Sequence, residues 1–475
     1  MSVVRSYWHT AVWAAILVGV WTVDAAEPNP AGDAPVVSVV ADGSGDYRTI
    51  QEAVDHAPEE AVVQIGKGTW NEAVLVTRPL TLVGAGWEHC RIVSASAGKR
   101  GASPELIAGL SQIARELDAE TQEKLQEAFL KVFGASPALT VKGAARVVVR
   151  NIAFLRSEPV RKGSFKGDTA IAILDSDVEI ENCAVLESPG TGVSVEGDSH
   201  VKLKHCLIAN AWGKGVVVGV SKNGSFEASE CEIRNNQYSG MSIGSPSPAI
   251  LVTRCRIDGA GWHGIRYDGC SPRIEDNVFH RTAVSGIYAS GATSATVRNN
   301  LFYHSGMSCW FQNGDTIESN TFVGDRNSRE KGGITQGLQV LGTSQPTVRR
   351  NLFVGCESAV SLGDIGFEGP HSKSTGKVTL VENSFWDNER NLSRYDVQAK
   401  AEQSLPLPEG NLEKEPQFVA AEKRDFELAE GSPLMSAGIG ARGFAPFESP
   451  WPVQPEEQRS IEAVAERLQQ TGGSR

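Results

Sequence analysis

The sequence predicts an all-β chain folded as a right-handed parallel β-helix, a solenoid with a cap at each end and a short helical insertion. The chain repeats itself from about Ala145 to Asp387, and two aligned columns of residues support this prediction. The first column consists of Cys183, Cys206, Cys231, Cys255, Asn277, Asn300, Asn320, Asn351 and Asn383, at steps of 23, 25, 24, 22, 23, 20, 31 and 32 residues. The second column, of the form Gly-apolar-x-apolar, keeps the same period from Gly192 to Gly337.

Each repeat contains short alternating strands separated by Gly, Asn and Asp turns, without helical periodicity. A unit of this size cannot bury a core alone, so the units must stack. Because successive rungs lie about 4.8 Å apart, equivalent side chains should form straight files, and the asparagines should form a ladder of amide hydrogen bonds. Leucine-rich repeats are the alternative, but the leucine spacing they need is absent.

The eight cysteines do not indicate disulfides, although cysteines in an exported protein usually do. Four of them share one inward position in successive rungs, where parallel side chains cannot reach the disulfide dihedral of about 90° without strain. We therefore expect a file of buried, reduced thiols that act as small hydrophobic groups. The other four are scattered and contain no Cys-x-x-Cys pair, so they predict neither a bridge nor a metal site: Cys90, Cys270, Cys309 and Cys356.

Residues 1–26 are predicted to be a signal peptide. Arg5 precedes an apolar run from Ala11 to Trp21, and Val23-Asp24-Ala25 provides a small-residue cleavage pattern. An uncleaved membrane anchor is the alternative, but the run is shorter than the roughly 20 residues of a spanning helix. The protein is therefore expected to be secreted, periplasmic or on the cell surface, with no membrane contact beyond this peptide.

The remaining chain divides into three predicted parts. The β-helix domain covers residues 36–395, a C-terminal cap segment covers 396–455, and a charged helical tail covers 456–475. Residues 101–134 interrupt the repeat with helical spacing, and Ser103, Pro104 and Gly134 are suitable capping residues. This insertion is expected to cover one flank of the coil; a groove wall or a partner surface is the alternative.

The N-terminal part of the coil resembles pectinesterases. Asp42 to Tyr47 with Thr49 to Ala53, and Gly68-Thr69-Trp70-Asn71-Glu72 with Leu80 to Gly84, are similar to the opening of that family. The similarity covers about sixty residues and then continues as generic repeats of the pectin-lyase-like superfamily. The pectinesterase catalytic motifs are replaced here by Thr169-Ala170-Ile171, Pro189-Gly190-Thr191 and Lys214-Gly215-Val216. Pectinesterase activity is therefore not expected, and the shared motif predicts a shared cap.

One outward-facing cluster could carry chemistry. Strand alternation places Arg266 and Asp268 on one outward face, about 7 Å apart, with Tyr288 one rung above Arg266 and Trp310 two rungs above Asp268. His263 precedes the same strand. The predicted catalytic residues are Arg266, Tyr288, His263 and Asp268, and the predicted substrate-binding residues are Trp310, Gln339 and Glu196.

These residue types favour a carbohydrate. Trp310 and Tyr288 could stack on sugar rings, Arg266 could bind a carboxylate, and His263 or Tyr288 could transfer a proton beside that carboxylate. The predicted function is polysaccharide handling, with lyase- or epimerase-like action on uronate-containing glycans as the leading hypothesis. The alternatives are a non-catalytic carbohydrate-binding or surface-structural module, in which Arg266 and Asp268 form an ordinary surface pair.

Charge and spacing exclude several other classes. A net charge of −12 argues against nucleic acid, and anionic sugars would need locally gathered cations. Glu196 and Asp268 are three rungs apart, about 14 Å, which is too far for a glycosidase pair. Asp364 and Glu368 lie in a loop that leaves hydrolysis open. No cluster has metal-ligand spacing, although a calcium site in the loops stays possible.

Overall fold

The computed structural model describes residues 34–94, 137–156, 169–324, 336–363, 376–396, 399 and 401–444. The predicted signal peptide, the insertion at 101–134, the tail at 456–475, and the loop containing Asp364 and Glu368 lie outside these residues. Within the described ranges, no helix is long and apolar enough to cross a membrane.

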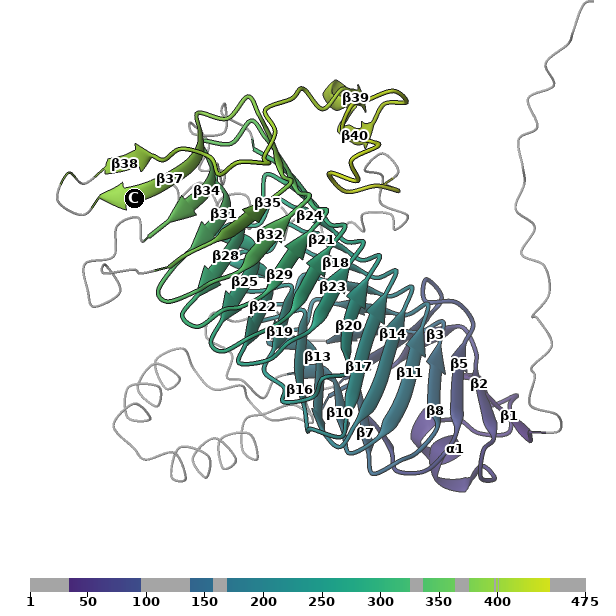
Figure 1. Cartoon of the computed structure of the whole chain (residues 1–475). Helices are drawn as coiled ribbons and strands as arrows, with labels where there is room; N and C mark the ends of the chain where they lie inside the picture. Colours follow the sequence, from purple (N-terminus) through teal and green to yellow (C-terminus); the bar gives the residue numbers. More distant parts are fainter. Residues whose placement is uncertain are drawn as a thin grey trace, which may run out of the picture. The chain divides into compact units, whose positions relative to one another are not determined.

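Three long sheets make up the coil (Figure 1). Sheet A consists of β1 (Val36–Val39), β2 (Val62–Ile65), β5 (Thr81–Gly84), β8 (Val147–Arg150), β11 (Asp177–Glu181), β14 (His200–Lys204), β17 (Ser225–Ser229), β20 (Ile250–Thr253), β23 (Arg273–Glu275), β26 (Thr296–Arg298), β29 (Thr316–Glu318), β32 (Thr347–Arg349) and β35 (Thr379–Val381). Sheet B consists of β3 (Gly68–Trp70), β6 (Cys90–Ser94), β9 (Ala153–Arg156), β12 (Ala184–Leu186), β15 (Leu207–Ala209), β18 (Glu232–Arg234), β21 (Arg256–Asp258), β24 (Val278–His280), β27 (Leu301–Tyr303), β30 (Thr321–Val323), β33 (Leu352–Val354) and β36 (Ser384–Trp386). Sheet C consists of β4 (Val74–Val76), β7 (Leu139–Lys142), β10 (Thr169–Leu174), β13 (Thr191–Gly197), β16 (Val216–Val220), β19 (Met241–Ile243), β22 (His263–Asp268), β25 (Ser285–Ser290), β28 (Met307–Trp310), β31 (Gln336–Val340), β34 (Ser358–Leu362), β37 (Arg390–Asp396) and β38 (Ala401–Ser404).

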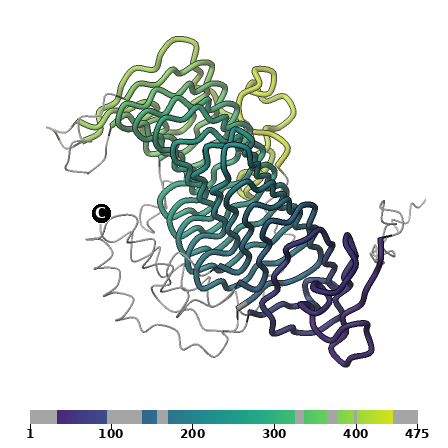
Figure 2. Tube along the Cα trace, turned by 90° about the horizontal axis from the view of Figure 1, so that it is seen from below, coloured from purple at the N-terminus to yellow at the C-terminus, as the bar shows by residue number. Residues whose placement is uncertain are grey.

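The chain visits the sheets in a fixed order, one strand each per turn, as in β13, β14 and β15. Neighbouring strands are parallel and in register, apart from the terminal β37–β38 pair, which is antiparallel. Val193 pairs with Val216, and Val216 with Met241, so like residues stack directly above one another. These features confirm the predicted right-handed parallel β-helix, whose stacked windings are visible in Figure 2.

Left-handed residues turn the chain at its corners. In one turn, Gly197, His205 and Asn210 have φ values of 71°, 50° and 61°. The corner before the Cys/Asn column is left-handed in ten rungs: Asn151, Asn182, His205, Glu230, Arg254, Asp276, Asn299, Ser319, Arg350 and Glu382. One residue with positive φ reverses the local backbone direction, which lets a strand end and the next begin without a long loop.

The glycine column is explained by close contact between rungs. A Cβ atom on Gly240 would lie 2.7 Å from the carbonyl oxygen of Gly264, and one on Gly264 would lie 2.5 Å from that of Gly286. A side chain at Gly240 or Gly264 would therefore push adjacent rungs apart, although alanine occupies the same column at Ala170 and Ala359.

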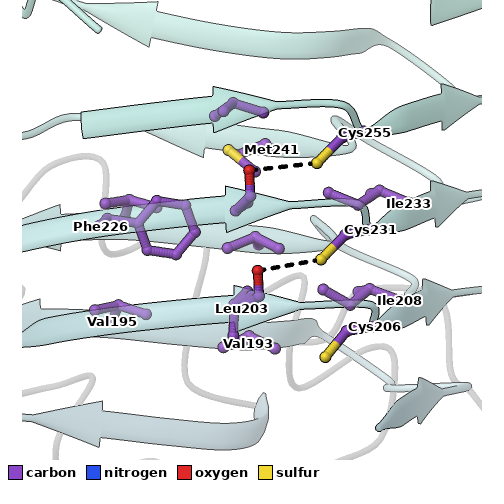
Figure 3. Packing of buried hydrophobic residues seen from close by; sticks show 14 of the residues in the cluster. Val193, Val195, Leu203, Cys206, Ile208, Phe226, Cys231, Ile233, Met241 and Cys255 are labelled. Carbon is purple, nitrogen blue, oxygen red and sulfur yellow. Dashed lines mark hydrogen bonds between the residues drawn. The ribbon is translucent and has the colours of Figure 1, made fainter. Parts of the chain in front are cut away.

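The thiol file forms as predicted. All eight cysteines lie within the described residues, and all are buried and free of disulfides. Cys206, Cys231 and Cys255 lie above one another inside the coil (Figure 3), and each Sγ donates to a backbone carbonyl, as from Cys231 to Leu203 at 3.5 Å. Hydrogen bonds with the neighbouring thiols and burial raise the pKa of Cys231 well above its usual value, which keeps the thiol protonated.

The asparagine ladder also forms as predicted. Each Nδ2 donates to the Oδ1 of the next rung, at 3.0 Å from Asn277 to Asn300 and 2.9 Å from Asn300 to Asn320. The ladder continues through Asn351 and Asn383. It ends on Asn411, which follows the last repeat and which the sequence did not predict.

The N-terminal end of the core is covered by helix α1 (Ile50–His56), whose residues Ile50, Ala53 and Val54 are buried. Thr49 caps the helix, and the carboxylate of Glu72 accepts the backbone N–H groups of Ile50 and Gln51, both at 3.0 Å. Glu72 is the last residue of the Gly68-Thr69-Trp70-Asn71-Glu72 motif, which therefore has a capping role here.

After β38 the chain runs back along sheet B, through β39 (Phe418–Ala420), a 3₁₀ turn (Ala421–Lys423) and β40 (Asp425–Leu428) (Figures 1 and 2). Backbone N–H groups of three consecutive residues donate to three successive rungs: Gly440 to Arg350 O, Ala441 to Thr321 Oγ1 and Arg442 to Asn299 Oδ1, each at 2.8 Å. Leu428, Leu434 and Ile439 pack against Leu352 of β33. This segment therefore covers the outer face of sheet B at its C-terminal rungs, from β27 to β33.

Candidate functional site

The outer face of sheet C brings together most of the predicted site residues. Arg266 of β22 pairs with Tyr288 of β25, and Tyr288 pairs with Ser308 of β28. Asp268 pairs with Ser290, and Ser290 pairs with Trp310, which places Trp310 two rungs above Asp268. The observed strand register therefore places these residues on the outward face of sheet C, as strand alternation in the sequence predicts.

Arg266 lies beside both a carboxylate and a ring. Its Nη2 is 3.4 Å from Asp268 Oδ2, and its guanidinium carbon is 5.5 Å from the centre of the Tyr288 ring. The Asp268 side chain is 53 % exposed, so this ion pair contributes little stability and water can compete for it. The guanidinium can exchange Asp268 for an external anion at small cost.

His263 is buried, which weakens its predicted role as a proton carrier. It is the first residue of β22 and is only 2 % exposed. Its ring lies between Trp262 and Tyr288, at centroid distances of 4.9 and 4.6 Å, and its Nδ1 lies 2.8 Å from Ser285 Oγ. Burial, together with the charge of Arg266, lowers the pKa of His263 to about 3. The imidazole is therefore neutral at physiological pH and is a weak base.

The environment of Tyr288 also makes its phenol a poor base for abstracting a proton. Burial raises the pKa of its phenol above the usual value, and Arg266 opposes this rise only in part. The phenol stays protonated near neutral pH, so it serves as a hydrogen-bond donor and as a ring surface.

Three aromatic residues that the sequence analysis did not select extend this cluster. We call the whole set the aromatic stripe; its members are Tyr238, Trp262, His263, Tyr288, Trp310 and Phe311. Neighbouring centroids are 6.4, 4.9, 4.6, 6.0 and 6.0 Å apart in that order. Tyr238, Trp262 and Phe311 are 45 %, 42 % and 37 % exposed, which is unusual for rings of this size.

These three residues lie at corners, where the alternation rule for strands does not apply. A signal for two of them exists in the sequence, because Tyr238 and Trp262 both stand two residues before a glycine of the Gly-apolar-x-apolar column. The structure confirms that they share one file, since the N–H of Trp262 donates to the carbonyl of Tyr238 at 2.9 Å.

A second cation lies next to Arg266. Lys214 Nζ is 3.2 Å from Ser242 Oγ, and Ser242 pairs with Arg266 in the adjacent rung. Lys214 lies two rungs from Arg266, and its ammonium group reaches the rung between them, in a chain whose net charge is −12. Two cationic side chains are therefore close to the stripe despite the negative net charge of the chain.

The two remaining predicted residues differ in position. Gln339 of β31 pairs with Ser308, whose hydroxyl donates to Gln339 Oε1 at 3.0 Å, so it borders the stripe. Glu196 of β13 accepts from Ser194 Oγ at 2.9 Å and lies three rungs below Asp268, so it is remote from the stripe. The described residues contain no group of three or more His, Cys, Asp or Glu side chains that could hold a metal ion.

Comparison with known proteins identifies a family for the coil. Residues 137–302 and 246–397 match the family model described as a right-handed β-helix region, and together these matches span more than half of the chain. The matched residues begin at 137, so the match does not include the N-terminal segment for which a resemblance to pectinesterases is expected, and that resemblance stays an expectation. No curated protein matches the chain.

Several solved structures share the fold at low identity. The catalytic domain of a GH87 α-1,3-glucanase in complex with tetrasaccharides is 12 % identical, with 82 % of this chain and 70 % of that chain covered and a TM-score of 0.53. The periplasmic alginate epimerase AlgG is 13 % identical, with 80 % and 82 % covered and a TM-score of 0.46. PfbA, a surface adhesin of Streptococcus pneumoniae, is 12 % identical, with 77 % and 94 % covered and a TM-score of 0.48. At 12 % identity, the likeness to the glucanase shows a shared fold and nothing beyond it.

Proposed function

The chain belongs to the right-handed β-helix family, and from this premise we propose that it binds a polysaccharide along the outer face of sheet C. The observation that carries the proposal is the aromatic stripe with its two adjacent cations. Six rings follow one another from the corner before β19 to the corner after β28, and three of them are substantially exposed.

The geometry of the stripe suits an extended chain of sugar rings. Aromatic faces pack against the apolar C–H faces of pyranose rings, and a series of them supports successive units of one chain. The stripe covers four rungs, which is about 14 Å along the coil axis, and it also crosses the width of sheet C. A ligand that follows it would contact Tyr238 and Trp262 at one end and Trp310 and Phe311 at the other.

The charges favour an acidic glycan, such as one that contains uronate. A guanidinium can bind a carboxylate through two parallel hydrogen bonds, and Lys214 adds a second positive charge one rung away. Because the Arg266–Asp268 pair is exposed and long, its replacement by a sugar carboxylate costs little.

Elimination or epimerisation remains the finer hypothesis for the same site. The proximity of Arg266, Tyr288 and His263 favours it, since all three lie in contact. The low pKa of His263 and the raised pKa of Tyr288 oppose it, because neither group is a strong base at neutral pH. Incubation with pectate, alginate and glycosaminoglycans, with and without calcium, tests it by the ultraviolet absorbance of unsaturated uronate for elimination and by the uronate composition of the product for epimerisation. If Tyr288→Phe and wild type give equal turnover, this assignment is wrong.

Binding is best tested with two tryptophan variants. Trp262 and Trp386 are 42 % and 38 % exposed, but Trp386 lies on sheet B, so Trp386→Ala is a matched control for Trp262→Ala. In affinity electrophoresis through gels containing pectate, alginate or a neutral glucan, wild type should be retarded by an acidic polysaccharide. Trp262→Ala and Arg266→Ala should lose about tenfold in affinity, whereas Trp386→Ala should match wild type. Equal retardation of the two tryptophan variants would contradict the proposal.

We also propose export, with cleavage near residue 26, to the cell surface, the periplasm or the medium. A polysaccharide-binding face is useful where polysaccharides occur, and the N-terminal sequence has the pattern of a signal peptide. N-terminal sequencing of the protein recovered from each cell fraction tests this proposal; recovery of uncleaved protein from the cytoplasm would contradict it.

A further inference from the structure

Phe311 occupies a corner at which neighbouring rungs carry glycine. The equivalent corners after β22, β25 and β31 are formed by Gly269, Gly291 and Gly342, with φ values of 59°, 83° and 64°. Phe311, after β28, has a φ of 63°. Left-handed backbone is accessible to glycine but unfavourable for a side chain as bulky as phenylalanine. Of these four corners, only the corner at Phe311 therefore carries backbone strain.

The rung above holds Phe311 in this conformation. Ser344 Oγ donates to the carbonyl oxygen of Phe311 at 2.7 Å. Gly342 lies so close that a Cβ atom on it would be 3.0 Å from Phe311 N and 3.1 Å from Phe311 Cα. A serine hydroxyl and a glycine in the next rung thus support the strained residue.

Burial of the ring does not offset this strain. Phe311 is 37 % exposed and is among the few large hydrophobic side chains that the described part of the chain leaves exposed. Its ring lies 6.0 Å from that of Trp310, at the end of the aromatic stripe. Strained residues that the fold does not need tend to mark functional positions.

We infer that Phe311 is a glycan-contacting residue that sets how many sugar units the stripe holds. This inference rests on the proposed binding function and adds a specificity role at one end of the site. A long oligosaccharide reaches from Trp262 across Tyr288 and Trp310 to Phe311, whereas a short one is held by Trp262, Tyr288 and Arg266 alone. Phe311 therefore contributes to the affinity for long chains and not to that for short ones.

The test separates the ring from the backbone. Phe311→Gly removes both the ring and the strain, so it should raise the melting temperature and weaken binding of long acidic oligosaccharides by about tenfold. Phe311→Ala removes the ring and keeps the strained backbone, so it should lose the same affinity without the gain in melting temperature. Gly269→Ala adds strain at an equivalent corner, where the added Cβ meets no atom within 4 Å, so it should lower the melting temperature and leave binding unchanged.

Calorimetric titration with one acidic polysaccharide cut to short and long oligosaccharides provides the readout. Failure of wild type to bind any acidic glycan would overturn the proposed function itself. If wild type binds and Phe311→Gly binds long oligosaccharides equally well, the role of Phe311 is wrong while the proposed function stands. A fall in the melting temperature of Phe311→Gly would show that the ring serves the fold, which would also overturn the inference.

Discussion

The two halves of the coil have different side chains at the same position, just after the left-handed corner of each rung. In the N-terminal half, the position after the left-handed corner is a cysteine from Cys183 to Cys255, and the next inward position is Val185, Ile208, Ile233 or Ile257. In the C-terminal half these positions hold asparagine and phenylalanine. The phenylalanine rings of Phe279, Phe302, Phe322, Phe353 and Phe385 form one stack, with centroids 4.5 to 5.2 Å apart and planes within 9° of parallel.

The cysteine and asparagine side chains make hydrogen bonds to equivalent backbone carbonyls, at different distances. Cys255 Sγ donates to Ala228 O and Thr253 O at 3.5 and 3.3 Å. Asn300 Nδ2 donates to the equivalent carbonyls in its own rung and the rung before, those of Arg298 and Ile274, both at 2.9 Å. A thiol therefore occupies the place of the amide nitrogen, with weaker and longer bonds.

The amide adds an oxygen that the thiol lacks. Asn300 Oδ1 accepts both the backbone N–H and the Nδ2 of Asn277, at 2.9 and 3.0 Å, so each asparagine ties one rung to the next. The change from thiol to amide occurs between Cys255 and Asn277, where Cys255 N donates to Asn277 Oδ1 at 2.8 Å. The aromatic stripe begins just before this junction and extends over the asparagine half, so the more firmly bonded rungs carry most of the candidate site.

The largest expected effect is a difference in the loss of stability between Asn320→Ala and Cys231→Ala. Asn320→Ala removes the acceptor for two donors of Asn300 and the donor to Val297 O and Asn351. Because buried polar groups are then left unpaired, we expect a loss of about 3–5 kcal/mol in the free energy of unfolding. Cys231→Ala should cost about 1 kcal/mol, since it removes only a small thiol with weak bonds. Urea unfolding measures both, and equal losses would contradict the distinction between the halves.

Acid should act first at the junction between the halves. The folded pKa of His263 lies below its unfolded value, so its neutral form stabilises the protein above the unfolded pKa of about 6.5. As the pH falls from there toward about 3, His263 binds a proton in the unfolded state but not in the folded state. We expect a loss of about 1.4 kcal/mol per pH unit in this window, and His263→Asn should remove that part of the slope.

The His263→Asn variant also separates the contribution of His263 to acid unfolding from that of other titratable residues. Burial lowers the pKa of His280 as well, so part of the acid sensitivity should persist in His263→Asn. The thiols of Cys183 and Cys231 should stay protonated throughout this range, because burial raises the pKa of Cys183 and thiol neighbours raise that of Cys231. Unfolding curves from pH 7 to 4 provide the measurement, and an unchanged slope in His263→Asn would show that another group controls acid unfolding.

The sequence predicts what repeats and misses what occurs once. The Cys/Asn column and the glycine column recur in many rungs, so their alignment alone predicts the coil, the ladder and the outer face of sheet C. Asn411 escapes this reasoning because it joins the ladder from the segment after the last repeat. The burial of His263 depends on Trp262 and Tyr288 in adjacent positions, and strand alternation says nothing about how rings from a corner and a neighbouring rung enclose a side chain.

Hydroxyl-radical footprinting of the two exposed tryptophans in one molecule tests the central claim most directly. Trp262 and Trp386 have similar exposure but lie on different sheets, so they should be oxidised at similar rates in the free protein. With an acidic polysaccharide bound, the account predicts that oxidation of Trp262 falls severalfold while that of Trp386 is unchanged. Protection of Trp386 instead, or equal protection of both, would contradict the assignment of sheet C as the binding face.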